Sequence, residues 1–149
     1  MRNLKVKEII EYAKKLEHEA FSFYVTALKT ASEKTKELIS ELAVEEEKHY
    51  NLLDKLLNDK NITPNTFNTM LVVDTSLMKT LDESEKITES STELEILNIA
   101  AQKELDTKAL YTMYLTFDEL PQNIFDIFEN LANQEEGHYN TIQAKIKQL

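Results

Sequence analysis

The sequence predicts an all-α protein folded as an antiparallel four-helix bundle. Apolar residues recur with helical spacing along four long segments of the chain. One Gly and two Pro leave little material for the many tight turns of an all-β fold. The length of 149 residues suits a single domain, 1–149, that can bury a sizeable core.

The first two helices are expected to pair as a hairpin. The apolar stripes predict one helix from about Lys7 to about Thr30 and another from about Glu33 to about Asn58. Thr30 and Glu33 have the spacing of a capping box at the start of the second helix. Only a few residues join these helices, so they form an antiparallel hairpin over about 5–59.

A second hairpin is expected over about 91–148. Its first helix begins near Thr92 and ends near Phe117, and its second starts at Pro121, a good first-turn residue, and runs to about Lys147. Two pairs at the start of this hairpin have capping-box spacing: Ser90 with Glu93, and Thr92 with Glu95.

A long crossover, about 60–90, joins the hairpins. Connections of this length are uncommon unless they cross a domain or are disordered. This one carries an apolar run, Met70 to Val73, and the pattern of a short helix around Leu77 to Leu81. We therefore expect it to run the length of the bundle and cover one face.

Composition and charge exclude several classes of function. The net charge of −10 argues against nucleic acid as a partner, because phosphate binding needs a cationic surface. The absence of Cys excludes disulfides and cysteine-ligated metal sites within these residues. There is no signal-peptide pattern and no apolar run long enough to span a membrane. A cytoplasmic protein without a membrane partner is expected.

An internal repeat relates the two hairpins. Residues 42–51 read LAVEEEKHYN and residues 131–140 read LANQEEGHYN, with seven of ten positions identical. The other two helices share a Glu seven residues before a Tyr, as Glu17 with Tyr24 and Glu104 with Tyr111. The repeat predicts a bundle with internal pseudo-two-fold symmetry.

Each helix places one Glu on the face that must be buried. The apolar residues three, four and seven positions away share that face with Glu17, Glu46, Glu104 and Glu135. Unpaired carboxylates in a dry core cost several kcal/mol each or must hold protons. No inward Lys or Arg compensates them, whereas divalent cations would.

Two histidines complete the pattern. His49 and His138 each follow a buried Glu by three residues, so each E-x-x-H unit projects a carboxylate and an imidazole from one helix face. With the other two Glu they supply six ligands for two ions of iron, manganese or zinc. His18 lies on the solvent-facing side of its helix and is expected to be a surface residue. Glu47 and Glu136 are expected to point away from the cluster.

These motifs resemble the ferritin-like di-iron proteins, in particular the erythrin domain of the rubrerythrins. The resemblance covers essentially the whole chain. It implies that Glu17 and Glu104 are ligands, that Glu46 and Glu135 bridge or chelate, and that His49 and His138 each bind one of two irons. Rubrerythrins usually also carry a rubredoxin domain with Cys-bound iron, which a chain without Cys does not have.

A seventh carboxylate of that family is missing here. Ala101 and Thr107 stand one turn either side of Glu104, and Lys14 and Ala20 stand likewise around Glu17. Because the resemblance links this carboxylate to redox-dependent iron movement, its absence favours a simpler six-ligand site of ferritin or bacterioferritin type.

The favoured function is a di-iron oxidoreductase, of peroxidase or oxidase type, that reduces peroxide or dioxygen with electrons from an external donor. Two alternatives stay open: a ferritin-type ferroxidase or iron-handling protein, and a helical module with a structural metal. The resemblance also implies a homodimer. Tyr24 and Tyr111 either donate hydrogen bonds to ligand carboxylates, act in electron transfer, or pack in the core with a satisfied hydroxyl. Gly137, the only Gly, either admits a close neighbour or a local bulge, or has no special role.

Overall fold

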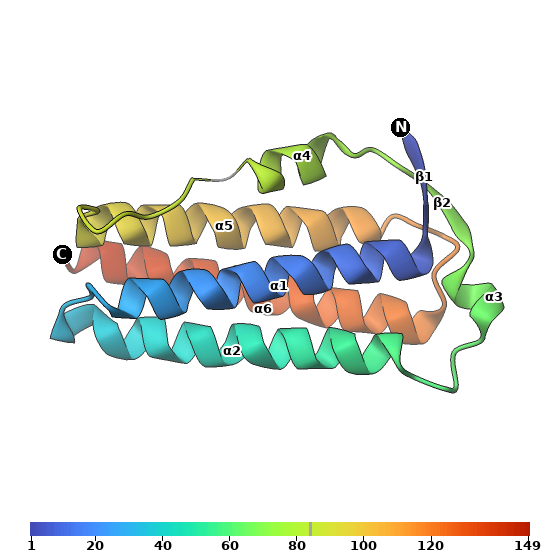
Figure 1. Cartoon of the computed structure of the whole chain (residues 1–149), viewed down its shortest axis with the longest axis horizontal. Helices are drawn as coiled ribbons and strands as arrows, with labels where there is room; N and C mark the ends of the chain where they lie inside the picture. Colours follow the sequence, from blue (N-terminus) through green and yellow to red (C-terminus); the bar gives the residue numbers. More distant parts are fainter. Residues whose placement is uncertain (84) are drawn as a thin grey trace.

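Four long helices lie side by side and form the body of the molecule (Figure 1). The computed structural model describes residues 1–83 and 85–149, so residue 84 of the predicted crossover lies outside the described residues. The elements in chain order are β1 (Arg2–Lys5), α1 (Val6–Leu28), α2 (Glu33–Leu57), α3 (Pro64–Phe67), β2 (Met70–Val73), α4 (Ser76–Asp82), α5 (Glu93–Tyr114) and α6 (Gln122–Lys147).

The two predicted hairpins are confirmed. Helix α1 packs along α2, and α5 packs along α6, with α1 also contacting α5 and α2 contacting α6. Helices α1 and α5 end slightly earlier than predicted, at Leu28 and Tyr114. The chain ends lie at opposite ends of the bundle (Figure 1). In the described part of the chain, no helix combines the length and the apolar character that crossing a membrane requires.

One of the capping boxes predicted for α5 is present. The Glu95 amide donates to Thr92 Oγ1 at 3.1 Å, and the Thr92 amide donates to Glu95 Oε1 at 3.4 Å. These two bonds satisfy amides that the first helical turn leaves without partners. Pro121 lies at the N-cap of α6 and not in its first turn, so that prediction was wrong by one position.

The capping box predicted between Thr30 and Glu33 is absent, because the N-cap of α2 is Ser32, two residues later than that motif requires. The Ser32 hydroxyl donates instead to Glu93 of α5 at 2.5 Å, and the buried Thr35 hydroxyl donates to the same carboxylate oxygen. These contacts join the turn of the first hairpin to the start of the second.

A small sheet departs from the all-α prediction. Strands β1 and β2 pair antiparallel, with Leu4 opposite Leu71. In β2, Leu71 and Val73 are buried while Met70 and Val72 are exposed, so the apolar run packs one of its two faces on the bundle. Strand β1 is too short to show the alternating pattern that identifies a strand in sequence.

The crossover runs along the bundle as predicted (Figure 1). It passes from the end of α2 to the start of α5 and carries α4 over α1 and α5. The Tyr12 hydroxyl of α1 donates to the Met78 carbonyl at 2.9 Å and to Asp82 Oδ1 at 3.0 Å. This hydroxyl therefore fixes the crossover helix against the first hairpin.

The buried apolar side chains form two clusters, one toward each end of the bundle. One contains Ile9, Leu53, Leu110 and Phe128, and the other contains Ala27, Ile39, Leu97 and Ile142. The four Glu of the sequence pattern belong to neither cluster and occupy the chain positions between them on each helix. The fold thus places a charged layer across the middle of an otherwise apolar core.

Candidate metal centre

Each long helix contributes one buried carboxylate to this layer. Glu17 of α1, Glu46 of α2, Glu104 of α5 and Glu135 of α6 are at most 2% exposed. His49 is 3% exposed as a whole residue, and the side chain of His138 is 15% exposed. The structure therefore brings together the six residues that the sequence singled out as ligands.

The six side chains form two overlapping groups. One consists of Glu17, Glu46, His49 and Glu135, and the other of Glu46, Glu104, Glu135 and His138. Within each group the candidate ligand atoms lie within 4.8 Å of one another. Ligands about 2.1 Å from a common ion are at most about 4 Å apart, so each group is slightly wider than one metal position and would contract around an ion. Because Glu46 and Glu135 belong to both groups, they are placed to bridge two ions.

Both imidazoles turn Nδ1 toward the carboxylates. His49 Nδ1 lies 3.0 Å from Glu135 Oε1 and 3.3 Å from Glu17 Oε2. His138 Nδ1 lies 3.1 Å from Glu46 Oε1 and 3.4 Å from Glu104 Oε2. The rings stack with centroids 5.7 Å apart and planes 15° from parallel. Each group thus contains one imidazole.

Several of these atoms have no hydrogen-bond partner although they are buried. They are Glu46 Oε1, Glu104 Oε2, Glu135 Oε1 and His138 Nδ1. His138 Nδ1 lies 3.1 Å from Glu46 Oε1, but neither atom makes a hydrogen bond. A buried polar atom without a partner costs about 1–3 kcal/mol, and a charged one costs more. Divalent cations would satisfy all four atoms, so the donor set fits the two ions that the sequence predicts.

Two buried tyrosines donate hydrogen bonds to the outer carboxylates, Glu104 and Glu17, each of which belongs to only one group. The Tyr24 hydroxyl of α1 donates to Glu104 Oε1 of α5 at 2.6 Å. The Tyr111 hydroxyl of α5 donates to Glu17 Oε1 of α1 at 2.7 Å. Of the roles that the sequence left open for these tyrosines, the structure shows the hydrogen bonds together with burial in the core. Each bond fixes the orientation of a carboxylate that belongs to only one group.

The carboxylates differ in proton affinity. Burial, together with the charges of Glu17 and Glu104, raises the pKa of Glu46 well above its ordinary value. Burial and the charges of neighbouring carboxylates raise the pKa of Glu135 in the same way. Burial also acts to raise the pKa of Glu17, but hydrogen bonds involving Glu46, His49 and Tyr111 outweigh it and leave that pKa lowered. Without metal, the two shared carboxylates therefore keep their protons to a higher pH than an ordinary Glu does.

The family model of the rubrerythrins matches residues 8–146. This chain belongs to the rubrerythrin family. No curated protein sequence is significantly similar to it.

Two solved structures share the fold of this rubrerythrin-family chain. A Thermotoga maritima protein described as ferritin-like diiron-carboxylate has 22% identity, a TM-score of 0.78, and coverage of 99% of this chain and 97% of its own. A hypothetical protein from Pyrococcus furiosus has 22% identity, a TM-score of 0.65, and coverage of 97% and 89%.

The positions one turn either side of Glu104 hold no acidic side chain that could act as a seventh carboxylate. Ala101 is buried, and the Thr107 hydroxyl donates to the Lys103 carbonyl at 2.8 Å. Within the described residues, the two groups contain no carboxylate besides the four Glu already named. The site is therefore built from six side chains.

Three side chains that the sequence set aside lie outside the cluster. His18 is exposed and its ring contacts Tyr50. Glu47 is exposed, and Glu136 is exposed and pairs with Lys108 at 3.1 Å. A side chain at Gly137 would meet open space, so of the alternatives left open for this Gly the structure does not show a close neighbour.

Gln134 also belongs to the site and was not predicted from the sequence. His49 Nε2 lies 2.6 Å from Gln134 Oε1, which makes this amide the outer partner of a candidate ligand. The available signal was the repeat, in which Gln134 directly precedes Glu135 as Glu45 precedes Glu46.

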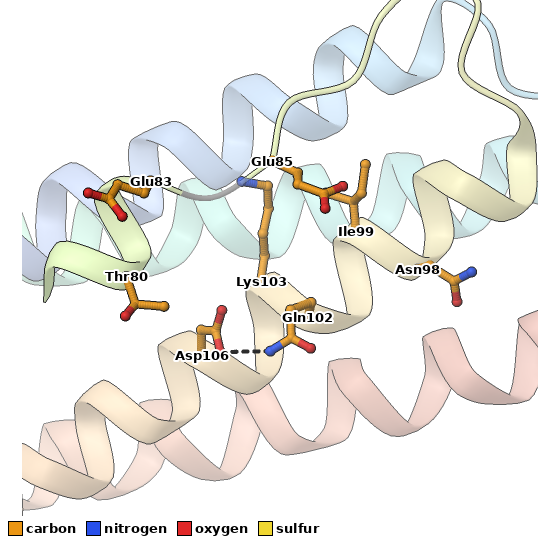
Figure 2. A pocket seen from close by; sticks show the side chains of 8 residues that line it. All are labelled: Thr80, Glu83, Glu85, Asn98, Ile99, Gln102, Lys103 and Asp106. Carbon is orange, nitrogen blue, oxygen red and sulfur yellow. Dashed lines mark hydrogen bonds between the residues drawn. The ribbon is translucent and has the colours of Figure 1, made fainter. Parts of the chain in front are cut away.

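A surface cavity of about 500 Å³ lies where the crossover meets α5 (Figure 2). Its wall includes Glu83, Glu85, Gln102, Lys103 and Asp106, with a 2.8 Å hydrogen bond from Gln102 to Asp106. None of the six candidate ligands lines it. This cavity is therefore separate from the metal centre.

Proposed function

We propose that this chain is a non-haem di-iron oxidoreductase that reduces peroxide or dioxygen with electrons from an external donor. The observation that carries the proposal is the pair of overlapping groups that share Glu46 and Glu135. Two ions bridged by carboxylates suit a two-electron reaction at one buried point. Carboxylate and imidazole ligands suit iron, and they also admit manganese or zinc.

The chain itself would hold and orient the metals. Glu17 and His49 would bind one iron, Glu104 and His138 the other, and the shared carboxylates both. When bound there, ferrous ions supply the two electrons that cleavage of an O–O bond needs. Burial raises the pKa of Tyr24 and Tyr111 well above the ordinary value, so their hydroxyls keep their protons and stay donors to Glu104 and Glu17.

Burial of the site favours a small oxidant. The side chains of the other ligands are at most 4% exposed, while His138 reaches 15%, so an oxidant would approach from the His138 side. Hydrogen peroxide takes up two electrons and two protons and leaves as two water molecules. A separate donor protein or small reductant would then return two electrons to the site. We further propose that the chain acts in the cytoplasm as a homodimer.

Rapid mixing tests this function. The metal-free chain is loaded anaerobically with two equivalents of ferrous iron and mixed separately with hydrogen peroxide and with dioxygen. We expect at least one oxidant to oxidise both irons within seconds, at a rate well above that of ferrous iron in buffer. In a Glu46→Gln variant, iron should be oxidised no faster than ferrous iron in buffer. Oxidation no faster than in buffer with both oxidants would contradict the proposal.

A ferroxidase that passes iron to a store is the second candidate. It is favoured by the six-residue site, because Ala101 and Thr107 leave no seventh carboxylate beside Glu104. This function needs a closed shell of many subunits. Light scattering that gives a monomer or dimer would exclude it, and a particle of many subunits that retains oxidised iron would favour it.

A further inference from the structure

The two histidines of the metal centre have different outer partners. His49 Nε2 lies 2.6 Å from Gln134 Oε1, and the Gln134 amide nitrogen donates to Asn130 Oδ1 at 3.0 Å. Asn130 and Gln134 are one turn apart on α6, so this short chain of hydrogen bonds spans from the surface to the candidate ligand.

These contacts select one tautomer of His49. Because the Gln134 amide nitrogen is used by Asn130, the Gln134 carbonyl oxygen faces the ring and accepts the proton of Nε2. The lone pair of a neutral His49 is then on Nδ1, the atom that faces Glu17 and Glu135. This is the form that a metal requires, and a hydrogen-bonded outer partner also makes the nitrogen a stronger donor.

His138 lacks such an arrangement. The repeat places Glu45 where α6 has Gln134, but Glu45 pairs with Lys48 at 3.2 Å on the surface of α2. In the described part of the chain, His138 has ion-pair contacts through Nδ1 only, and that atom has no hydrogen-bond partner. Its side chain is also 15% exposed, against 4% for His49.

We propose that Gln134 is a positioning residue that makes the metal position at His49 bind more tightly than the position at His138. Both rings already face the carboxylates through Nδ1, but only His49 has an outer partner that holds its ring and keeps a proton on Nε2, so that Nδ1 is left for the metal. Outer partners of this kind change metal affinity by about 10–100-fold. The chain would therefore load its two ions in two separate steps, the first at His49. The inference rests on the proposed metal centre.

Anaerobic titration of the full metal-free chain with cobalt(II) tests this, because its visible absorption reports each metal position. We expect two cobalt ions per chain in two resolved steps. Gln134→Leu, which removes the acceptor, should weaken the tighter step about 10–100-fold and leave the weaker step unchanged. Gln134→Glu, which keeps an acceptor, should retain the wild-type affinity or exceed it. Glu45→Gln is the matched control at the repeat position and should change neither step.

The outcomes separate the two proposals. Two equal affinities in the wild-type chain, or unchanged binding in Gln134→Leu, would overturn the role of Gln134 and leave the metal centre standing. Equal losses of metal affinity in Gln134→Leu and Gln134→Glu would also overturn it, since they would indicate that Gln134 acts only through packing. A wild-type chain that binds no cobalt would contradict the metal centre itself. Circular dichroism of each metal-free variant checks that the helices are retained.

Discussion

Tyr24 on α1 donates a 2.6 Å hydrogen bond to Glu104 on α5, across the interface between the two hairpins. Tyr111 on α5 returns the same contact to Glu17 on α1, at 2.7 Å. The two bonds are related by the pseudo-symmetry of the sequence repeat. Each joins the hairpins at the level of the metal centre, so the orientation of the outer carboxylates and the packing of the bundle are coupled.

Tyr24→Phe should weaken metal binding. Glu104 would lose the donor that orients it, and we expect the affinity for one ferrous ion to fall about 10-fold. The free energy of unfolding should fall by about 1.5–3 kcal/mol, the usual contribution of a hydrogen bond to a charged group. Anaerobic iron titration and chemical denaturation measure the two effects.

Tyr114→Phe is the control for that variant. Tyr114 is also buried, but its hydroxyl donates at 3.0 Å to the Ile9 carbonyl, away from the carboxylates. Its removal should cost about 1 kcal/mol of stability and leave metal affinity unchanged. Equal losses of affinity in both variants would contradict a specific role for Tyr24.

The stability of the metal-free chain should fall as pH rises. Burial and neighbouring charges raise the folded-state pKa of Glu46 and Glu135 well above the ordinary 4.5. Such groups bind protons more tightly when folded, so the stability they contribute is present below about pH 4.5 and is lost as pH rises through the folded pKa. Thermal melts between pH 5 and 9 measure this trend, and the metal-loaded chain should not show it. Identical thermal melts of the metal-loaded and metal-free chains at pH 8 would contradict the prediction.

Replacing a shared carboxylate by its amide should stabilise the metal-free chain. Glu46→Gln is close in size and cannot ionise, so at pH 8 it avoids the cost of a buried charge, about 1–3 kcal/mol. The same change abolishes bridging and should remove iron binding. Glu47→Gln, one residue away on the exposed face, should alter neither property. A metal-free Glu46→Gln chain that is less stable than wild type at pH 8 would argue against this account.

Gly137→Ala should stabilise the chain by about 0.5–1 kcal/mol. Gly137 lies inside α6 with open space where a side chain would stand, so Ala gains helix propensity without a clash. Denaturant unfolding measures the change. Lys48→Gly, at the matching repeat position on the exposed face of α2, should lose a similar amount. Destabilisation by Gly137→Ala would indicate that this Gly has a structural role.

The sequence predicted the parts of this protein that periodicity and repetition encode. Long amphipathic stripes located the four helices, and Glu17 stood out because its same-face neighbours are apolar. The repeat then connected Glu46 and His49 with Glu135 and His138. Residues that break a strong local pattern are visible without a structure, and here they are the ones that meet in the core.

Features that depend on contacts between distant segments were not predictable. Strand β1 forms only because Leu4 meets Leu71 from the crossover. The predicted cap at Thr30 is absent, and Ser32 and Thr35 at the start of α2 bind Glu93 of another helix instead. Gln134 looks like an ordinary half-buried polar residue until its distance to His49 is known. Each case depends on a partner more than 50 residues away, which local spacing does not encode.

Equilibrium binding of ferrous iron under anaerobic conditions tests the metal centre most directly. We expect the metal-free chain of 149 residues to take up two irons. A Glu46→Gln, Glu135→Gln double variant, which lacks both shared carboxylates, should take up none in the same concentration range. The variant should remain helical, because the neutral amides remove buried charge. Uptake of fewer than two irons by the wild-type chain, or of two irons by the folded double variant, would contradict the proposed metal centre.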